Sequence, residues 1–378
     1  MKRLVQTLAG LAISGAALWL TLRGKDLAGI WEAIRAADYS VLLPYVAILL
    51  VVHLVRTVRW GILLEPMARV PFARLNAVAA VGFMALVLLP FRLGEFARPY
   101  LVADRPRLRV SAALSSVVVE RVADGLFTGL LLVLVLLAVP DGTPGVSVLR
   151  VGGLVVSLAF AGLVVFLAGA YRNRALAVKI TGRLIGPVSP RLAERVSGMM
   201  DAFIHGLRLV PSRGKLLAFF LLTVVYWGLN GYGMSVLARG FGFELSAVAA
   251  YATLGVLVVG VMIPAGPGMV GTFQGAVVVG LALFFDRQAV ATRGVAYANV
   301  LWAVQIAQQT ALGLIFLPSR HVRLSALLAA PGAVEAGLED EEREYQAGAE
   351  RSEAAEERRP GPRGLGAPPA AESSRRKS

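Results

Sequence analysis

The chain alternates long apolar runs with short polar segments, most of which are basic. A helix that crosses a bilayer needs roughly 20 apolar residues, because each residue advances a helix by about 1.5 Å. The pattern therefore predicts about six spanning helices. These runs cover residues 4–22, 41–55 with a continuation to 64, 112–139, 148–170, 216–237 and 290–317. The first run begins after a basic start and lacks an A-x-A-like cleavage site, which favours a spanning helix over a signal peptide.

One apolar run does not fit this scheme. Residues 75–89 are only fifteen in number, and they lead into LLPFRLGEFARPYL (88–101), which carries three charges. Basic segments flank the run on both sides. A re-entrant hairpin that enters from the cytoplasm and returns there satisfies both the short length and the charge.

A second break lies in MIPAGPGMV, between two apolar arms. Pro90/Gly94 and Pro264/Gly268 share the spacing P-x-x-x-G, and the flanking charges place the two breaks on opposite sides. Opposed units of this kind are typical of inverted repeats, although so short a match also arises by chance. The predicted fold is an all-α polytopic membrane protein, with about six spanning helices and two oppositely oriented re-entrant helical hairpins.

Composition supports a membrane protein. The chain is 57% hydrophobic, with a mean hydropathy of +0.68 and a net charge of +14. In such a protein, basic loops indicate the cytoplasmic side and contact with anionic lipid, not nucleic acid. We expect residues 1–323 to form a transmembrane domain and residues 324–378 a disordered cytoplasmic tail. The protein is then a multi-pass protein of the cell inner (cytoplasmic) membrane, with its N-terminus also cytoplasmic.

Several kinds of chemistry find no support in the sequence. There is no cysteine, and the three histidines are far apart, so we expect no metal site and no cofactor. No GxxxxGK[ST] motif is present, so the chain is not expected to hydrolyse nucleotide through a P-loop.

Charged residues nevertheless recur at helical spacing within apolar segments. Glu120 and Asp124 share a helix face beside Arg121; Arg56 and Arg59 share another; Arg92, Glu95 and Arg98 follow the first break. A charge at membrane depth costs about 2.5–3.5 kcal/mol on insertion scales, so such residues are retained for a reason. One interpretation is a structural ion-pair network. The other is an arginine-rich cavity for a phosphate headgroup, since guanidinium binds phosphate bidentately.

The motifs RTVRW (56–60), LLPFRLGEFARPYLV (88–102), ERVADG (120–125) and IPAGPGMVGTFQ (263–274), in this order, resemble the flippase-like integral membrane family. That family includes the transmembrane region of lysylphosphatidylglycerol synthases and stand-alone relatives. The resemblance implies translocation of a lipid between leaflets. It also implies that the charged residues form a polar core and that the chain has a second break. Together with the polar centre of the last apolar run, these residues form the candidate substrate-binding set. The set is Arg56, Arg59, Arg92, Gly94, Glu95, Arg98, Glu120, Arg121, Asp124, Pro264, Gly268, Gly271 and Gln305.

We therefore expect a non-enzymatic flippase or transporter for a phosphate-bearing lipid, aminoacylated or isoprenoid-linked forms included. An intramembrane transferase that uses Glu120 or Asp124 as general base is the alternative, although no nucleophile–base arrangement is evident. A third possible function is that of an accessory membrane subunit of a lipid-synthesis pathway. The sequence leaves open a homo-oligomer and a complex with a lipid-synthesis enzyme.

Overall fold

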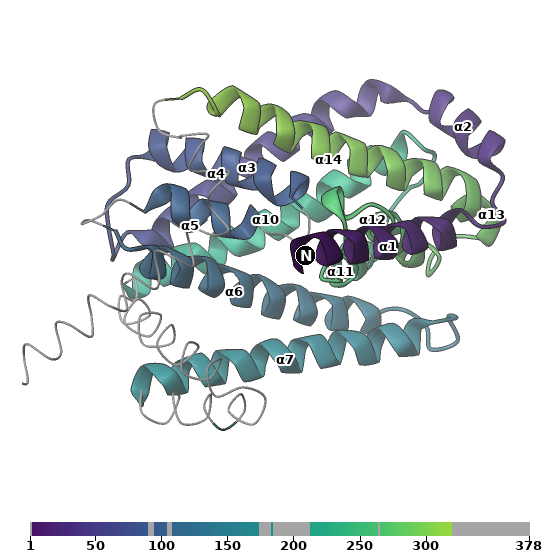
Figure 1. Cartoon of the computed structure of the whole chain (residues 1–378). Helices are drawn as coiled ribbons and strands as arrows, with labels where there is room; N and C mark the ends of the chain where they lie inside the picture. Colours follow the sequence, from purple (N-terminus) through teal and green to yellow (C-terminus); the bar gives the residue numbers. More distant parts are fainter. Residues whose placement is uncertain are drawn as a thin grey trace, which may run out of the picture.

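The computed structural model describes residues 2–89, 94–103, 108–173, 183, 212–263 and 265–319, and regular secondary structure in these residues is helical (Figure 1). The predicted tail, 324–378, lies outside the described residues, as do Arg92 and Pro264. The helical class predicted from the apolar runs is confirmed for the part of the chain described.

Three helices and a short 3-10 turn form the N-terminal part. The helices are α1 (Lys2–Leu22), α2 (Leu27–Arg35) and α3 (Leu42–Leu64), and the turn is η1 (Tyr39–Val41). The Asp38 carboxylate accepts a hydrogen bond from the Ser40 N–H and so caps this turn. The turn leads directly into α3, which carries two of the predicted arginines.

A helical hairpin follows. Its long arm is α4 (Phe72–Leu88), and its short arm is α5 (Ala97–Val102), which packs back along α4. Positions later in the short arm meet positions earlier in the long arm, so the arms are antiparallel. The pairs that meet are Gly94 with Leu86, Arg98 with Gly82, and Val102 with Arg74. The predicted reversal of the chain after residue 89 is thus present.

Gly94 makes this reversal compact. A Cβ at this position would overlap the backbone of Ala85 and Leu86 in α4, so no larger residue fits without moving the chain. The hairpin depends on this close approach of two backbones.

A long antiparallel pair comes next, α6 (Val110–Leu137) and α7 (Val146–Arg172), which lie side by side (Figure 1). Small residues bring them together, because Gly125 of α6 lies under the Phe160 ring of α7 and Gly129 lies against Ser157. The pair positions the carboxylates of α6 on the side away from α7.

The second half begins with α10 (Arg213–Arg239) and continues into a second helical hairpin. Its arms are α11 (Ala247–Gly260) and α12 (Thr272–Leu281), joined through the short turn η3 (Pro267–Met269). Gly260 meets Ala276, and Gly280 meets Thr253, so these arms are antiparallel as well. The chain then passes through α13 (Arg287–Ala289) and a π-type turn, η4 (Val290–Gly294), into α14 (Val295–Phe316).

The two halves exchange contacts reciprocally. The long arm α4 of the first hairpin packs on α14 of the second half, and the arm α11 of the second hairpin packs on α6 of the first half. Helices α3 and α10, which precede the two hairpins, pack on each other. They run antiparallel, since Tyr45 lies near Gly233 at one end and Glu65 pairs with Lys215 at the other.

Three helical segments in the described part of the chain are long and apolar enough to cross a membrane: Tyr39–Leu64, Val146–Gly169 and Arg213–Arg239. Helix α6 is longer than any of them, but each of its eighteen-residue stretches includes Glu120, Arg121 and Asp124. Helix α14 carries glutamines at 305, 308 and 309. These charged and polar positions, not shortness, separate α6 and α14 from the three apolar spans.

We predict that Gly94→Ala lowers the stability of the protein by about 1–3 kcal/mol, because the new methyl group must displace the α4 backbone. Thermal unfolding in detergent measures the effect. Gly152→Ala is the control, since Gly152 lies within α7 with no neighbour in reach of an added Cβ. A Gly94→Ala protein that unfolds at or above the wild-type temperature would contradict the close approach described above.

Candidate functional site

Six of the predicted polar residues meet in one place, between α3, α5 and α6. They are Arg56 and Arg59 of α3, Arg98 of α5, and Glu120, Arg121 and Asp124 of α6. We call this set the arginine cluster. Helical spacing explains the local part of the arrangement, because residues three or four apart share a face. The packing of three helices supplies the rest.

Glu120 is the centre of the cluster and is fully buried. Its Oε2 accepts a hydrogen bond from Arg98 Nη1 at 2.9 Å. Its Oε1 lies 3.6 Å from Arg121 Nη2 and 3.9 Å from Arg56 Nε, so these two guanidinium groups interact with the carboxylate mainly through charge. One carboxylate thus faces three guanidinium groups.

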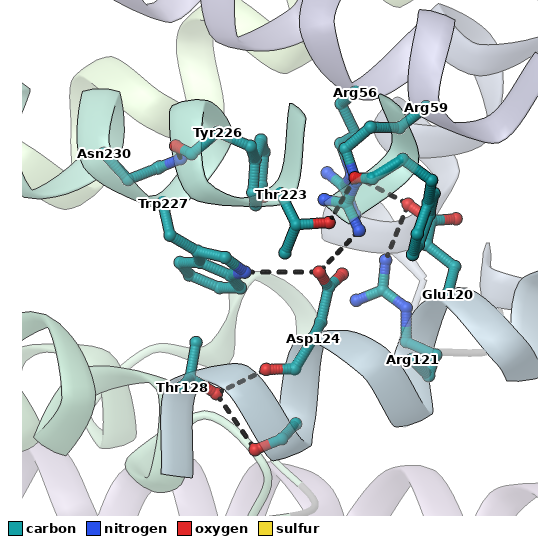
Figure 2. Close-up of polar contacts among 12 residues, drawn as sticks. Arg56, Arg59, Glu120, Arg121, Asp124, Thr128, Thr223, Tyr226, Trp227 and Asn230 are labelled. Carbon is teal, nitrogen blue, oxygen red and sulfur yellow. Dashed lines mark hydrogen bonds and ion pairs between the residues drawn. The ribbon is translucent and has the colours of Figure 1, made fainter. Parts of the chain in front are cut away.

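Asp124, one turn further along α6, forms a second ion pair. Arg59 Nη2 donates to its Oδ1 at 2.6 Å, and the indole N–H of Trp227 donates to the same oxygen at 3.2 Å. Figure 2 shows the carboxylate of Asp124 between Trp227 on one side and Arg59 on the other. Trp227 belongs to α10, so this pair links the two halves of the chain.

Aromatic rings cover the faces of the guanidinium groups. Arg56 lies 3.5 Å from the ring centroid of Phe83, and Arg59 lies about equally far from Phe219 and Tyr226, at 4.9 and 5.0 Å. Stacking of this kind contributes about 0.5–2 kcal/mol per pair and shields the charge from lipid. Because the rings cover the faces of the guanidinium groups, only their N–H edges are available for hydrogen bonds.

Several of those edges lack a protein partner. Within the cluster, Nε of Arg56, Nε and Nη1 of Arg59, and Nε and Nη2 of Arg121 are buried without a hydrogen bond to any described residue. A buried donor left unsatisfied costs about 1–3 kcal/mol or more when it is charged. The cluster therefore has hydrogen-bonding capacity for an anion.

Glu95 lies close enough to Arg98 and Arg121 to act on both electrostatically. Gly94 contacts the α4 backbone, so its part is to close the hairpin. Arg92 cannot be placed, because it lies outside the described residues.

The remaining predicted residues lie elsewhere. Gln305 donates to the Tyr45 hydroxyl at 3.0 Å, and Tyr45 precedes Arg56 by eleven residues, or about 16 Å of helix. The carbonyl of Gly268 accepts from Trp302 of α14, and Gly271 lies against the α1 backbone at Ser14. Both glycines have positive φ, which an L side chain rarely adopts. They serve the packing of the second hairpin and are not part of the arginine cluster.

The aromatic side chains from α10 were not predicted from the sequence. Tyr226, Trp227 and Phe219 lie in an apolar run that shows no polar signal of its own. Trp60 was also missed; its indole donates to Ser116, and its ring lies 5.2 Å from Arg98. For the tyrosine and the two tryptophans, the polar tip of the aromatic ring is the signal that could have pointed to them; Phe219 carries no such signal.

We predict that Asp124→Asn destabilises the protein by about 3–5 kcal/mol, because it leaves Arg59 buried without a counter-charge. The double substitution Arg59→Met/Asp124→Leu removes both charges and is expected to cost less than the single one. Thermal unfolding in detergent compares the variants. The control is Asp141→Asn, which breaks an exposed ion pair with Arg150 and should change stability by at most about 1 kcal/mol. Equal losses for Asp124→Asn and the double variant would argue against a buried pair.

Comparison with known families places this geometry in context. The family described as the lysylphosphatidylglycerol synthase transmembrane region matches residues 7–317, a span that contains the whole arginine cluster and both hairpins. Comparison with curated proteins gives no match. The match covers most of the chain, so the protein belongs to the lysylphosphatidylglycerol synthase transmembrane-region family, whose members are membrane proteins that handle lipids.

Proposed function

We propose that the protein moves a phosphate-bearing lipid from one membrane leaflet to the other. The observation that carries the proposal is the arginine cluster, in which four arginines face two carboxylates and several guanidinium N–H groups are buried without a partner. A phosphate group offers several oxygens to such donors and is the anion that guanidinium groups bind bidentately. The acyl or prenyl chains would remain in the apolar surroundings.

The depth of the cluster supports translocation. Glu120 is ten residues into α6, or about 15 Å along the helix, which is roughly half of a 30 Å hydrocarbon core. If α6 begins at one membrane surface, a headgroup bound at Glu120 would lie between the two leaflet surfaces.

The reciprocal packing supports a mechanism of alternating access. Each hairpin packs on the long helix that follows the other hairpin, α4 on α14 and α11 on α6, and α3 and α10 pair antiparallel. We infer an inverted repeat in which the two hairpins are re-entrant and move against a shared frame. The Asp124–Trp227 hydrogen bond would then report on the relative position of the halves.

We further propose that the protein lies in the cytoplasmic membrane with the N-terminus and residues 324–378 in the cytoplasm. The basic segments next to the ends of α3 and α10 carry this inference, because positive charge is retained on the cytoplasmic side. Anionic lipid would bind this face. No chemical step on the lipid is proposed: both carboxylates of the cluster are held by guanidinium groups, which makes either one a poor general base.

Transport can be measured on the full chain reconstituted into liposomes that contain a fluorescent phosphatidylglycerol, with a membrane-impermeant quencher added outside. We expect faster loss of protected fluorescence than in empty liposomes. Arg56→Ala should slow transport by about tenfold or more, the value of a lost hydrogen bond to a charged group. Arg56→Lys should be intermediate, because an ammonium keeps the charge but not the bidentate geometry.

Arg293→Ala provides the matched control. Arg293 also stacks on an aromatic ring, Phe243 at 5.4 Å, but lies outside the cluster, so its variant should transport at the wild-type rate. Absence of any acceleration over empty liposomes, tested with several phospholipid classes, would refute the transport proposal.

A further inference from the structure

The charges of the cluster specify more than the presence of a phosphate. Four arginines against two carboxylates leave two positive charges, and one remains when the nearby Glu95 is included. A net positive site in an apolar body is most favourably neutralised by a ligand with net negative charge. A zwitterionic headgroup brings no net charge, and a cationic one increases the imbalance.

The carboxylates offer little to an amino group. Glu120 is within 4 Å of three guanidinium groups, and Asp124 Oδ1 accepts from both Arg59 and Trp227. An ammonium would have to displace a buried guanidinium to reach either of them. Breaking such a pair is strongly unfavourable, because it leaves a buried charge without its partner.

The unsatisfied groups of the cluster are mainly donors. Five buried guanidinium nitrogens lack a hydrogen-bond partner among the described residues. Of the buried carboxylate oxygens in the cluster, only Glu120 Oε1 lacks a hydrogen-bond partner there. An ammonium is itself a pure donor and cannot satisfy the guanidinium N–H groups. A phosphate with a neutral or hydroxyl-bearing substituent supplies acceptors and adds no competing cation.

We propose that the site selects lipids with a net anionic phosphate headgroup and no ammonium, and discriminates against zwitterionic and aminoacylated phospholipids. This inference rests on the proposed function, because it takes the arginine cluster to be the lipid site. It narrows the substrate class from any phosphate-bearing lipid to acidic ones. Phosphatidate, phosphatidylglycerol and prenyl monophosphates have the required chemistry.

Binding can be followed through the intrinsic fluorescence of the purified full chain in a neutral detergent, because Trp60 and Trp227 both contact the cluster. The probes are short-chain phosphatidate, phosphatidylglycerol, phosphatidylcholine and lysyl-phosphatidylglycerol. We expect the two anionic lipids to bind at least about tenfold more tightly than phosphatidylcholine, and the lysyl lipid to bind most weakly. Equal or tighter binding of the zwitterionic or lysyl lipid would overturn the inference.

A water-soluble probe, glycerol 3-phosphate, tests whether the acyl chains are needed. Weaker binding than that of phosphatidate supports a lipid site, whereas equal binding identifies a soluble phosphate ester as the ligand and overturns the proposal.

Arg121→Gln should reduce the preference for anionic lipid, and Arg293→Gln should leave it unchanged. Arg121 is one of the more exposed members of the cluster, with 26% of its side chain accessible, so its variant is expected to fold. Arg56→Gln provides a second variant with the same expectation, and an unchanged preference in folded protein from both variants would overturn the proposal.

The same preparations separate the two proposals. Selective binding without transport would refute the proposed function and leave the headgroup selectivity standing. Transport without headgroup preference would support the proposed function and refute the selectivity.

Discussion

The burial of charge inside an apolar helical body is the constraint on which the structure depends. Glu120 is fully buried, and its negative charge is balanced by three guanidinium groups from α3, α5 and α6. Each charge alone would be costly at membrane depth, and each is retained because its neighbours compensate for it. The three helices are therefore fixed to one another at this point, and the short arm α5 is attached to α6 through the Arg98–Glu120 hydrogen bond.

Close backbone contacts allow this arrangement. Gly82 of α4 lies under the Arg98 side chain, and Gly94 lies on the α4 backbone, so the short arm can bring its arginine down to Glu120. Small residues have this role in membrane proteins because the hydrophobic effect gives little attraction between helices that are already in lipid. The ion pair between Arg98 and Glu120 thus depends on the close glycine contacts that hold the short arm against α4.

The second half of the chain, as far as the structure describes it, contributes aromatic side chains around the cluster, and no charged ones. Helix α10 carries no charge near the cluster, yet Trp227 donates to Asp124, and Phe219 and Tyr226 cover Arg59. The second hairpin instead contacts α1 and α14 through Gly271 and Gly268. The two halves share an order of elements but differ in chemistry: the first is ionic, and the second is neutral and polar.

The sequence by itself determined the helical membrane class, the two chain breaks, and which charged residues share a face of α3 and of α6. These features are local, since they follow from run length, Pro/Gly spacing and helical periodicity. Only the tertiary structure decided which faces meet: that Arg98 reaches Glu120, that α10 supplies Trp227, and that Gly268, Gly271 and Gln305 lie apart from the cluster. The physical reason is that lipid and protein interior are equally apolar, so hydrophobicity along such a helix does not mark its buried face.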